Sequence, residues 1–491
     1  MGSATADLEC DLSSQTGLNR ITDELRDPEH LVMQPAMTDN GRIPAICMTE
    51  NFLARVAVPV GAALCLLLSG CASSEPPPPL VTREVAPAAR VDPADPCTRE
   101  PPAGAPADQS APAGLRASFD RAANTVVLAA GEGTLASLSQ AVNDPAALRE
   151  LAPGEWLLGA QLEILPGASL RITAPAVRWL KLASGAGGYV SVRALGGALE
   201  VDGACVTSWD SALGRVDTED IDGRGFLLAR DGGRMSIDRA EIRYLGHGDV
   251  ESYGLSWRAN STGGITNSVV SHNYFGLYSA AVDGLVVADS EFHDSVLYGI
   301  DPHTGSRNLR IERNVVHDNG KHGIILAEDC TDSVIRENVV YNNQHHGIVL
   351  YLRSDRNLIE GNESFRNLTQ GININESADN VIRANRVYEN TESGVGVGKN
   401  SKDNLVEGNQ IRRNQEDGVR LFSAAAQTEV RANVIGENLR YGVYIDSPGA
   451  VQLTGNTIFG SRAGVLVKGQ PLIPEGDNEI YDNSEADIKT G

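Results

Sequence analysis

A glycine followed by an aliphatic residue recurs at a nearly fixed spacing through the C-terminal half of the chain. Leu, Ile or Val comes directly after each glycine, and from the third repeat on the residue three positions after the glycine is again aliphatic, except at Pro302. The intervals between these glycines are 22, 23, 24, 24, 24, 23, 24, 24 and 22 residues. The glycine column consists of Gly254, Gly276, Gly299, Gly323, Gly347, Gly371, Gly394, Gly418, Gly442 and Gly464. Such a period predicts a solenoid with one coil per repeat.

Two asparagine columns keep the same period. The first is Asn314, Asn338, Asn362, Asn385, Asn409, Asn433 and Asn456; the second is Asn319, Asn343, Asn367, Asn390, Asn414 and Asn438. Asparagine tolerates the left-handed backbone of tight turns, and stacked side chains can hydrogen-bond from coil to coil. The leucine pattern and helical segments of leucine-rich repeats are missing. The sequence therefore predicts an all-β protein, a right-handed parallel β-helix with coils of about 22–24 residues, in which these Gly and Asn residues are structural.

Strand alternation then sorts the remaining positions. Because the first and third residues after each glycine are aliphatic, the second and fourth point outward. In "YGIDPHTGS" (298–306) these outward positions hold Asp301 and His303, while Pro302 interrupts an inward column. Proline cannot donate to a strand ladder, and a broken local rule is typical of a functional site.

Histidines gather around this strand. Eight of the nine lie between positions 247 and 346, and Tyr298, His303, His322 and His346 fall on outward positions of three neighbouring coils. Such a patch suits proton transfer at neutral pH. The alternatives are an exposed structural ladder, above all for His272 and His345, and a zinc site of Asp301, His322 and His346. No local ligand spacing supports zinc, so we expect no metal.

The N-terminal part differs in composition. Arg55 and the apolar run Val56–Leu68 precede "LSGC", which resembles a bacterial lipobox, so residues 48–71 are expected to be a lipoprotein signal peptide with lipidation at Cys71. Residues 1–47 are either an upstream extension that is not translated or a cytoplasmic extension. Residues 72–112, rich in Pro and Ala, are expected to be a linker. We assign 113–470 to the β-helix with its groove, with short strands from about 113 to 250, and 471–491 to a C-terminal cap or tail.

The net charge and the cysteines limit the partners, disulfides and metal sites that the protein can have. The formal net charge is −23. Nucleic acids bind basic surfaces, so we expect no nucleic-acid partner. Beyond the lipobox only Cys97, Cys205 and Cys330 remain, so at most one disulfide can form, and no CxxC metal pattern is present.

The segment "YGIDPHTGSRNLRIERNVVHDNGKHGIIL" followed by "NVVYNNQHHGIVL" resembles the mannuronan C-5 epimerases, in particular the periplasmic poly(β-D-mannuronate) type. "VTSWDSALG" (206–214), "YLGHGDVESYGLSWR" (244–258) and "NYFGLYS" (273–279) extend the resemblance over roughly 115–400. It implies a right-handed parallel β-helix that converts β-D-mannuronate to α-L-guluronate within a polymer, without a cofactor. The nonapeptide repeats of the secreted branch are absent, so no calcium requirement is implied.

The resemblance also implies residue roles. His303 would be the base, Asp301 would orient it or tune its pKa, and Tyr298 or a water would act on the opposite face. Where periplasmic relatives carry an Arg that neutralises the substrate carboxylate, this chain has Glu328, and Thr304 follows "DPH" in place of an acid. Lys321, His322 or Arg353 would have to substitute. Because the chain is acidic, a groove for a polyanion must be locally basic; the candidates for substrate binding are Arg258, Lys321, His322, His346 and Arg353.

Two other functions stay open at this point. A polyuronate lyase shares the C5 proton abstraction but expels the O4 substituent, to which Tyr298 would donate a proton. A non-catalytic carbohydrate-binding or metal-delivery β-helix would explain the missing Arg. The expected partners are an alginate-like polyuronate, the membrane through a lipid anchor and other exopolysaccharide-assembly proteins. The expected location is the cell envelope, after export.

Overall fold

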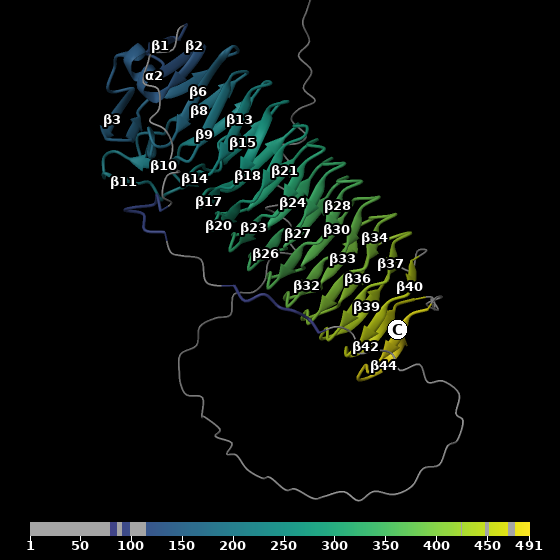
Figure 1. The fold of residues 1–491 in the computed structure, drawn as a ribbon. Coiled ribbons are helices and arrows are strands. Elements are labelled where there is room, and N and C mark those ends of the chain that lie inside the picture. Colours follow the sequence, from purple (N-terminus) through teal and green to yellow (C-terminus); the bar gives the residue numbers. More distant parts are fainter. Residues whose placement is uncertain (1–78, 86–90, 99–113, 424, 447–450, 470–476) are drawn as a thin grey trace, which may run out of the picture. The chain divides into compact units, whose positions relative to one another are not determined.

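The protein is a parallel β-solenoid in which successive coils contribute strands to three sheets (Figure 1). The structure, a computed structural model, describes residues 79–85, 91–98, 114–423, 425–446, 451–469 and 477–491. The predicted extension 1–47 and the predicted signal peptide 48–71, with Cys71, lie outside the described residues. Within the part that is described, none of the helices is both long and apolar enough to cross a membrane.

Three ladders of strands run the length of the solenoid, and we call them sheets A, B and C in the order in which the chain visits them. Sheet A contains β2 (Thr125–Thr134), β5 (Gln161–Ile164), β8 (Ser191–Leu195), β12 (Phe226–Arg230), β15 (Gly254–Arg258), β18 (Phe275–Ala280), β21 (Ile300–His303), β24 (Ile324–Ala327), β27 (Ile348–Tyr351), β30 (Ile372–Asn375), β33 (Val395–Gly398), β36 (Val419–Leu421), β39 (Tyr441–Ile445), β42 (Ala463–Val467) and β44 (Ala486–Thr490), with β1 (Arg116–Asp120) antiparallel to β2. Sheet B contains β6 (Ala168–Thr173), β9 (Ala198–Asp202), β13 (Arg234–Asp238), β16 (Thr262–Thr266), β19 (Val286–Ala288), β22 (Arg310–Glu312), β25 (Val334–Arg336), β28 (Leu358–Glu360), β31 (Val381–Arg383), β34 (Leu405–Glu407), β37 (Glu429–Arg431) and β40 (Gln452–Thr454). Sheet C contains β3 (Leu148–Ala152), β4 (Glu155–Leu158), β7 (Trp179–Ser184), β10 (Cys205–Asp210), β11 (Arg215–Val216), β14 (Glu241–Arg243), β17 (Val269–Ser271), β20 (Glu291–His293), β23 (Val315–His317), β26 (Val339–Tyr341), β29 (Glu363–Phe365), β32 (Arg386–Tyr388), β35 (Gln410–Arg412), β38 (Val434–Gly436), β41 (Thr457–Phe459) and β43 (Glu479–Tyr481).

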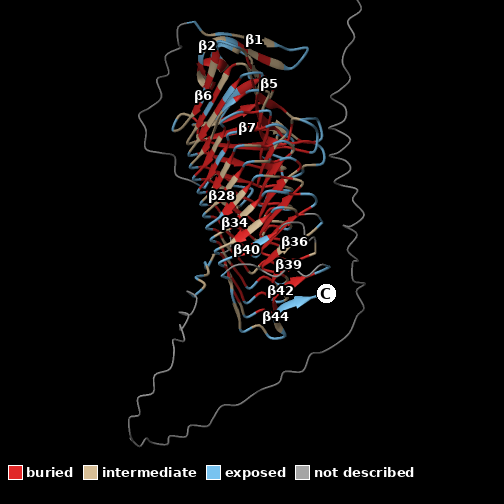
Figure 2. Cartoon of the chain, turned by 90° about the vertical axis from the view of Figure 1, so that its right-hand side faces the viewer, coloured by how far each residue is buried: buried red, intermediate tan, exposed pale blue. Residues whose placement is uncertain are grey.

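The aliphatic columns of the sequence form the core. Ile300 pairs with Ile324, which pairs with Ile348, and each of these side chains is fully buried. Figure 2 shows such buried strands through the solenoid, and the exposed β44 at its C-terminal end. Burying one aliphatic side chain stabilises a fold by roughly 1.5–3 kcal/mol, so this column repeats a favourable contribution in every coil. The predicted parallel β-helix and its inward positions are confirmed.

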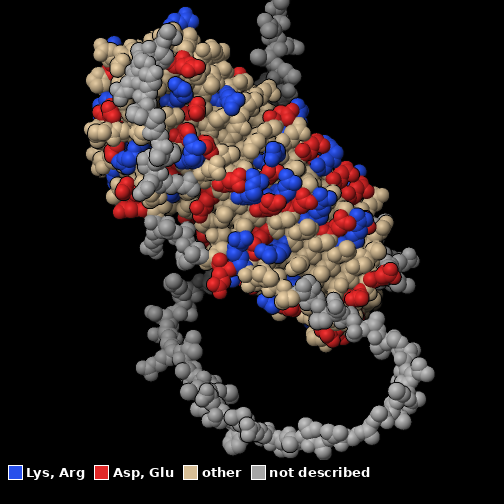
Figure 3. Space-filling view, viewed as in Figure 1, with Lys and Arg blue, Asp and Glu red and all other residues tan. Residues whose placement is uncertain are grey.

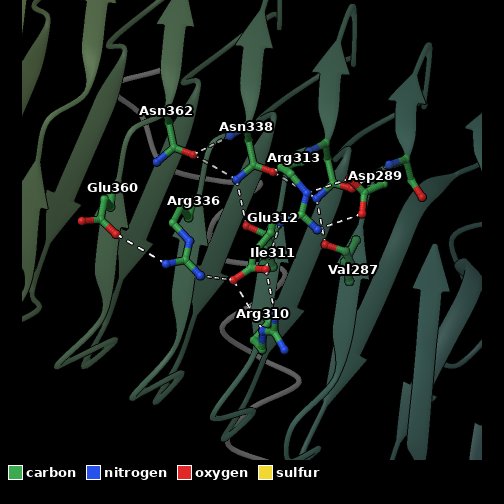
Figure 4. A network of polar contacts seen from close by, with 12 residues as sticks. Val287, Asp289, Arg310, Ile311, Glu312, Arg313, Arg336, Asn338, Glu360 and Asn362 are labelled. Atoms are coloured by element: carbon green, nitrogen blue, oxygen red, sulfur yellow. Dashed lines mark hydrogen bonds and ion pairs between the residues drawn. The ribbon is translucent and has the colours of Figure 1, made fainter. Parts of the chain in front are cut away.

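Asparagine ladders close one turn of each coil. The backbone N–H of Asn314 and its Nδ2 both donate to Oδ1 of Asn338, at 2.9 and 3.0 Å, and Nδ2 also donates to the Val287 carbonyl at 2.9 Å (Figure 4). Asn338 repeats this pattern with Asn362. The coil-to-coil bonding predicted for both columns is therefore present. A third ladder, which the sequence did not reveal because its first member is a serine, consists of Ser333, Asn357, Asn380 and Asn404.

Ion pairs tie neighbouring coils together on the outside. Glu312 accepts hydrogen bonds from Arg310 at 2.9 Å and from Arg336 at 2.7 Å, and Arg313 pairs with Asp289 (Figure 4). Basic and acidic side chains accordingly lie close together over much of the face seen in Figure 3. Pairs between exposed groups, such as Arg313 and Asp289, each contribute little, at most about 1 kcal/mol, whereas the Glu312 carboxylate is buried among its arginines, with 2 % of its side chain exposed.

The N-terminal coils contain the predicted short strands and one helix that was not predicted. Helix α2 (Leu135–Val142) begins after Thr134, whose side chain accepts a hydrogen bond from the backbone of Ser137, while the Ser137 hydroxyl accepts one from the backbone of Thr134. Leu135 and Leu138 of this helix join the core. The helix packs against β1 and β2 at the N-terminal end of the solenoid (Figure 1).

Residues 477–491, within the segment expected to be a cap or tail, contain two strands. β43 pairs with β41 in sheet C, and β44 pairs with β42 in sheet A, both in parallel. These residues therefore extend sheets C and A by one strand each.

Two pieces of the predicted linker lie against the solenoid, and we call residues 79–85 and 91–98 the N-terminal strap. Leu80 and Val85 pack on the aromatic side chains of sheet C, and Arg83 pairs with Glu363 at 2.9 Å. Cys97 forms a disulfide with Cys205 of β10, the single disulfide that the sequence allowed. In these ranges the linker is thus bound to the surface of the β-helix rather than held away from it.

Candidate active site

The strand β21 places Asp301 and His303 on the outward side of sheet A. Ile300 lies in the core, whereas the neighbouring Tyr278 and Ala280 of β18 pair with Asp301 and His303 and belong to a separate outer cluster. β21 pairs with β24 at Ile300 and at His303, and the two residues between them are skipped. A proline, which has no N–H, can occupy this gap without breaking a ladder bond.

His303 is almost enclosed and electrically neutral. Its side chain is 12 % exposed, and its ring stacks on Tyr278 with 5.9 Å between ring centroids. Burial lowers the pKa of His303; Glu328 raises it, and Arg258 lowers it further. The net shift is downward, so the imidazole carries no charge at pH 7 and has a lone pair available to accept a proton.

Arg258 is the cation beside this imidazole. It lies at the end of β15, two coils before His303, and its guanidinium sits 5.1 Å from the centre of the Tyr278 ring. Nε is 3.9 Å from Glu251, while the buried Nη1 has no hydrogen-bond partner among the described residues. An arginine has the planar, charged head group that can bind the carboxylate of a uronate with two parallel hydrogen bonds.

A second group of side chains lies across the same face, in the column that precedes the glycines. Lys321 donates a hydrogen bond to the Tyr298 hydroxyl at 2.8 Å. The ring of His322 stacks between Tyr298 and His346, at centroid distances of 5.5 and 5.1 Å. His345 stands edge-on to both histidines. The structure therefore brings together Tyr298, His322 and His346 of the predicted patch, with Lys321 bonded to Tyr298. His303, predicted in the same patch, contacts Tyr278 and Thr304.

The three histidines of this group could also be considered as a metal site. One ring nitrogen from each of His322, His345 and His346 lies within 4.8 Å of the others, and Asp301, which the zinc alternative included, does not belong to the cluster. However, Nδ1 of His322 accepts the backbone N–H of His346 at 3.3 Å, and Nδ1 of His346 accepts that of Gln370 at 3.2 Å. A neutral ring that accepts at Nδ1 carries its proton on Nε2. In His346 this Nε2 faces the side-chain amide of Asn373 at 3.0 Å, so both of its ring nitrogens are engaged within the protein.

Other predicted site residues lie elsewhere. Arg353 makes a bidentate ion pair with Asp329 at 2.6 and 2.7 Å on an exposed turn, so its guanidinium is already engaged. His293 and His317 stack on each other in sheet C, and His272 stacks on Tyr244. The histidines that looked like one patch in the sequence thus belong to different faces of the solenoid.

Sequence reasoning missed two contacts of His303. Tyr278 precedes Asp301 by one coil in the same column, so the column alignment contained the signal. The other contact is the hydrogen bond between His303 Nδ1 and Thr304 Oγ1, at 2.8 Å. Adjacent residues on a strand point to opposite faces, and only the turn that begins at Thr304 allows this bond.

The fold and the strand patterning define the class of protein. A family model described as a right-handed beta helix region matches residues 224–354 and 335–485, together more than half of the sequence. The chain belongs to this family.

The curated relatives narrow the class. A mannuronan C5-epimerase of Pseudomonas putida is 32 % identical over 167 residues, which cover 31 % of this chain and 32 % of the relative. That of Pseudomonas aeruginosa is 31 % identical over 222 residues, 41 % of this chain and 40 % of the relative. The matched part thus spans a third to two fifths of these relatives. The resemblance to mannuronan C-5 epimerases inferred from the motifs is confirmed.

A solved structure agrees in fold. The crystal structure of the periplasmic alginate epimerase AlgG superimposes with a TM-score of 0.60 at 22 % identity, over 75 % of this chain and 85 % of that chain. At this identity the match supports the architecture.

Proposed function

We propose that the protein is a mannuronan 5-epimerase, which converts β-D-mannuronate to α-L-guluronate in an alginate-like polyuronate. The observation that carries the proposal is the neutral, nearly enclosed His303 with Arg258 beside it on the outer face of sheet A. The names of the curated relatives support the same activity.

The chemistry requires both side chains. The C5 proton of a uronate is only weakly acidic while the adjacent carboxylate is ionised, because its removal adds negative charge beside an existing one. Arg258 would neutralise the carboxylate, His303 would take the C5 proton, and Tyr298, hydrogen-bonded to Lys321, would return a proton to the opposite face. Arg258 thus takes the role that the sequence sought in Lys321, His322 or Arg353.

Binding of a polyanion to this acidic chain needs a locally favourable surface. Arg258 and Lys321 supply positive charge on the groove, and the stacked rings of Tyr298, His322 and His346 lie beside Lys321. We place the substrate chain along sheet A, across successive coils spaced about 4.8 Å apart.

The proposal includes location and partners. We place the protein in the cell envelope, exported, anchored by lipid at Cys71 and acting beside other exopolysaccharide-assembly proteins. The Cys97–Cys205 disulfide supports export, because disulfides persist in oxidising compartments.

Proton NMR of polymannuronate incubated in D₂O with the purified full-length protein tests the function. We expect new guluronate signals, with deuterium at C5, because the proton removed and the proton returned are different. Unsaturated chain ends would instead identify a polyuronate lyase. Binding of the polymer without any change in its spectrum would identify a carbohydrate-binding protein and overturn the proposal.

A further inference from the structure

Thr304 and Glu328 occupy the same turn position in adjacent coils, the fifth after the column glycine. Both have left-handed backbone, with φ of 31° and 57°. The backbone N–H of Thr304 donates to the Ala327 carbonyl at 3.0 Å, and that of Gly305 donates to the Glu328 carbonyl at 2.9 Å. The two turns are thus held one coil apart, which brings the Glu328 carboxylate to the Thr304 hydroxyl.

The hydrogen bonds at this position have one consistent direction. Thr304 Oγ1 lies 3.2 Å from Oε2 of Glu328 and 2.8 Å from Nδ1 of His303. An ionised carboxylate can only accept, so the single hydroxyl proton of Thr304 points to Glu328. The lone pairs of Oγ1 then face Nδ1, and this contact is a hydrogen bond only if Nδ1 carries the proton.

We propose that Glu328, acting through Thr304, holds His303 in the tautomer protonated on Nδ1, so that Nε2 is the unprotonated atom that receives the C5 proton of the substrate. Glu328 and Thr304 are positioning residues, and their effect on catalysis rests on the proposed function of His303. Oε2 of Glu328 also lies 3.8 Å from Nδ1, so its negative charge stabilises the imidazolium once His303 has taken up the proton.

This assignment gives the two departures from the family pattern a joint explanation. The resemblance led us to expect an arginine at position 328 that serves the substrate carboxylate. In this chain position 328 is an acid that serves the base, while the cation facing His303 is Arg258. The imidazole therefore has a negative charge, Glu328, near Nδ1. The positive charge of Arg258 lies beside Tyr278, the ring that stacks on His303.

Glu328→Gln is the decisive variant. Its amide can donate to Thr304 Oγ1, which frees the hydroxyl to donate to Nδ1 and shifts the proton of His303 to Nε2. Long-range ¹H–¹⁵N NMR of ¹⁵N-histidine-labelled protein reports the tautomer, with His303 assigned through His303→Gln. We expect the Nδ1–H form in the parent, the Nε2–H form in Glu328→Gln, and a loss of epimerase activity of about 10²- to 10⁴-fold, as a wrongly held tautomer costs in a serine protease.

Asp332→Asn is the matched control. It removes the same charge four residues further on, where Asp332 pairs with Arg356 at 2.8 Å, and it should change neither tautomer nor activity. Thr304→Val keeps the side-chain shape but leaves Nδ1 without its acceptor, so the preference for the Nδ1–H tautomer should weaken, whereas Thr304→Ser should keep the parent behaviour.

The outcomes separate this inference from the proposed function. An Nε2–H tautomer in the parent, or an unchanged tautomer in Glu328→Gln, overturns the role of Glu328 whatever the activity. The expected tautomers in a protein that leaves polymannuronate unchanged would support the positioning and refute the epimerase assignment.

Discussion

Two ladders of stacked rings run along different faces of the solenoid and come from the same repeat. On sheet A the ladder is Tyr298, His322 and His346; on sheet C it is His293, His317, Tyr341, Phe365 and Tyr388. Both combine phenol and imidazole rings about 5 Å apart, the distance that one coil imposes. Residue type therefore does not distinguish them.

The two ladders differ in what surrounds them. The ladder of sheet C is covered by the N-terminal strap, with Leu80 and Val85 packed on it and Arg83 bonded to the Tyr388 hydroxyl at 2.9 Å. On the outer face of sheet A, Lys321, His345 and His346 beside the ladder are instead partly exposed. A stack of rings stabilises the fold where the chain covers it and becomes available for a ligand where it is left accessible.

The pKa values of the two central histidines reflect this contrast. Burial lowers the pKa of His317, but hydrogen bonds to Asp318 and Glu291 outweigh it and raise the pKa to about 9. Burial dominates at His303, where the net pKa shift is downward. His317 is thus a charged structural group at pH 7, whereas His303 is uncharged, as the proposed base must be.

The largest expected effect is that of His303→Ala. We expect it to abolish C5 deuterium incorporation, a loss of at least about 10³-fold, because no other group takes the proton. Since the side chain points away from the core, the thermal unfolding midpoint should stay close to that of the parent. The assignment of His303 as the base and His317 as a structural group would be wrong if His303→Ala remained active while His317→Gln, at a pH where it is folded, lost turnover.

Arg258→Ala should come next. We expect kcat/KM for polymannuronate to fall by about 10²- to 10³-fold, because the developing negative charge beside the carboxylate loses its counter-ion. Arg258→Lys should recover only part of this, since an ammonium cannot bind the carboxylate bidentately. Arg353→Ala is the matched control, and an equal loss in both variants would contradict the assignment of Arg258.

Removing the disulfide tests the covered face. Cys97→Ala with Cys205→Ala should lower the free energy of unfolding by about 2–4 kcal/mol, because a covalent link across a separation of 108 residues is lost. Turnover at 25 °C should not change, since the link lies on sheet C. Chemical denaturation and the deuterium assay, run on the same preparation, measure the two effects.

The pH dependence of stability isolates His317. Its folded-state pKa of about 9 lies above the ordinary value of 6.5, so its contribution is fully present below pH 6.5 and disappears as the pH rises through 9. We expect up to about 3 kcal/mol to be lost over this window in the parent. In His317→Gln this decline should be absent, which unfolding in urea at pH 6, 7.5 and 9 would show.

The sequence was sufficient for features that depend on one residue per coil. The glycine column, the aliphatic columns and the asparagine ladders each repeat one requirement, so their period was visible without coordinates. The helix α2 could not be predicted from the sequence, because its apolar residues also fit a short strand. Its N-cap, Thr134, gives no distinct signal by itself. The strap was missed because a Pro- and Ala-rich segment gives no periodic signal.

The candidate site was partly predictable. The outward position of His303 and the grouping of Tyr298, His322 and His346 follow from the columns. The separation of His293 and His317 could have been found too, because Tyr341 continues their spacing before the second asparagine column. The hydrogen bonds that link Glu328, Thr304 and His303 could not have been predicted from the sequence. They depend on side-chain directions at a turn where the backbone becomes left-handed.

The nearly fixed number of residues per coil decides which side chains lie on the outer face of sheet A. A residue faces the groove only if the number of residues before it is right, modulo one turn of the solenoid. Deleting one whole coil, such as residues 371–393 between Gly371 and Gly394, would shorten the groove by about 4.8 Å and leave every later side chain on its own face. Deleting half of that length would rotate all later coils out of alignment with His303. The length of polymer that the groove accommodates can therefore change in whole coils, without any change in the chemistry at β21.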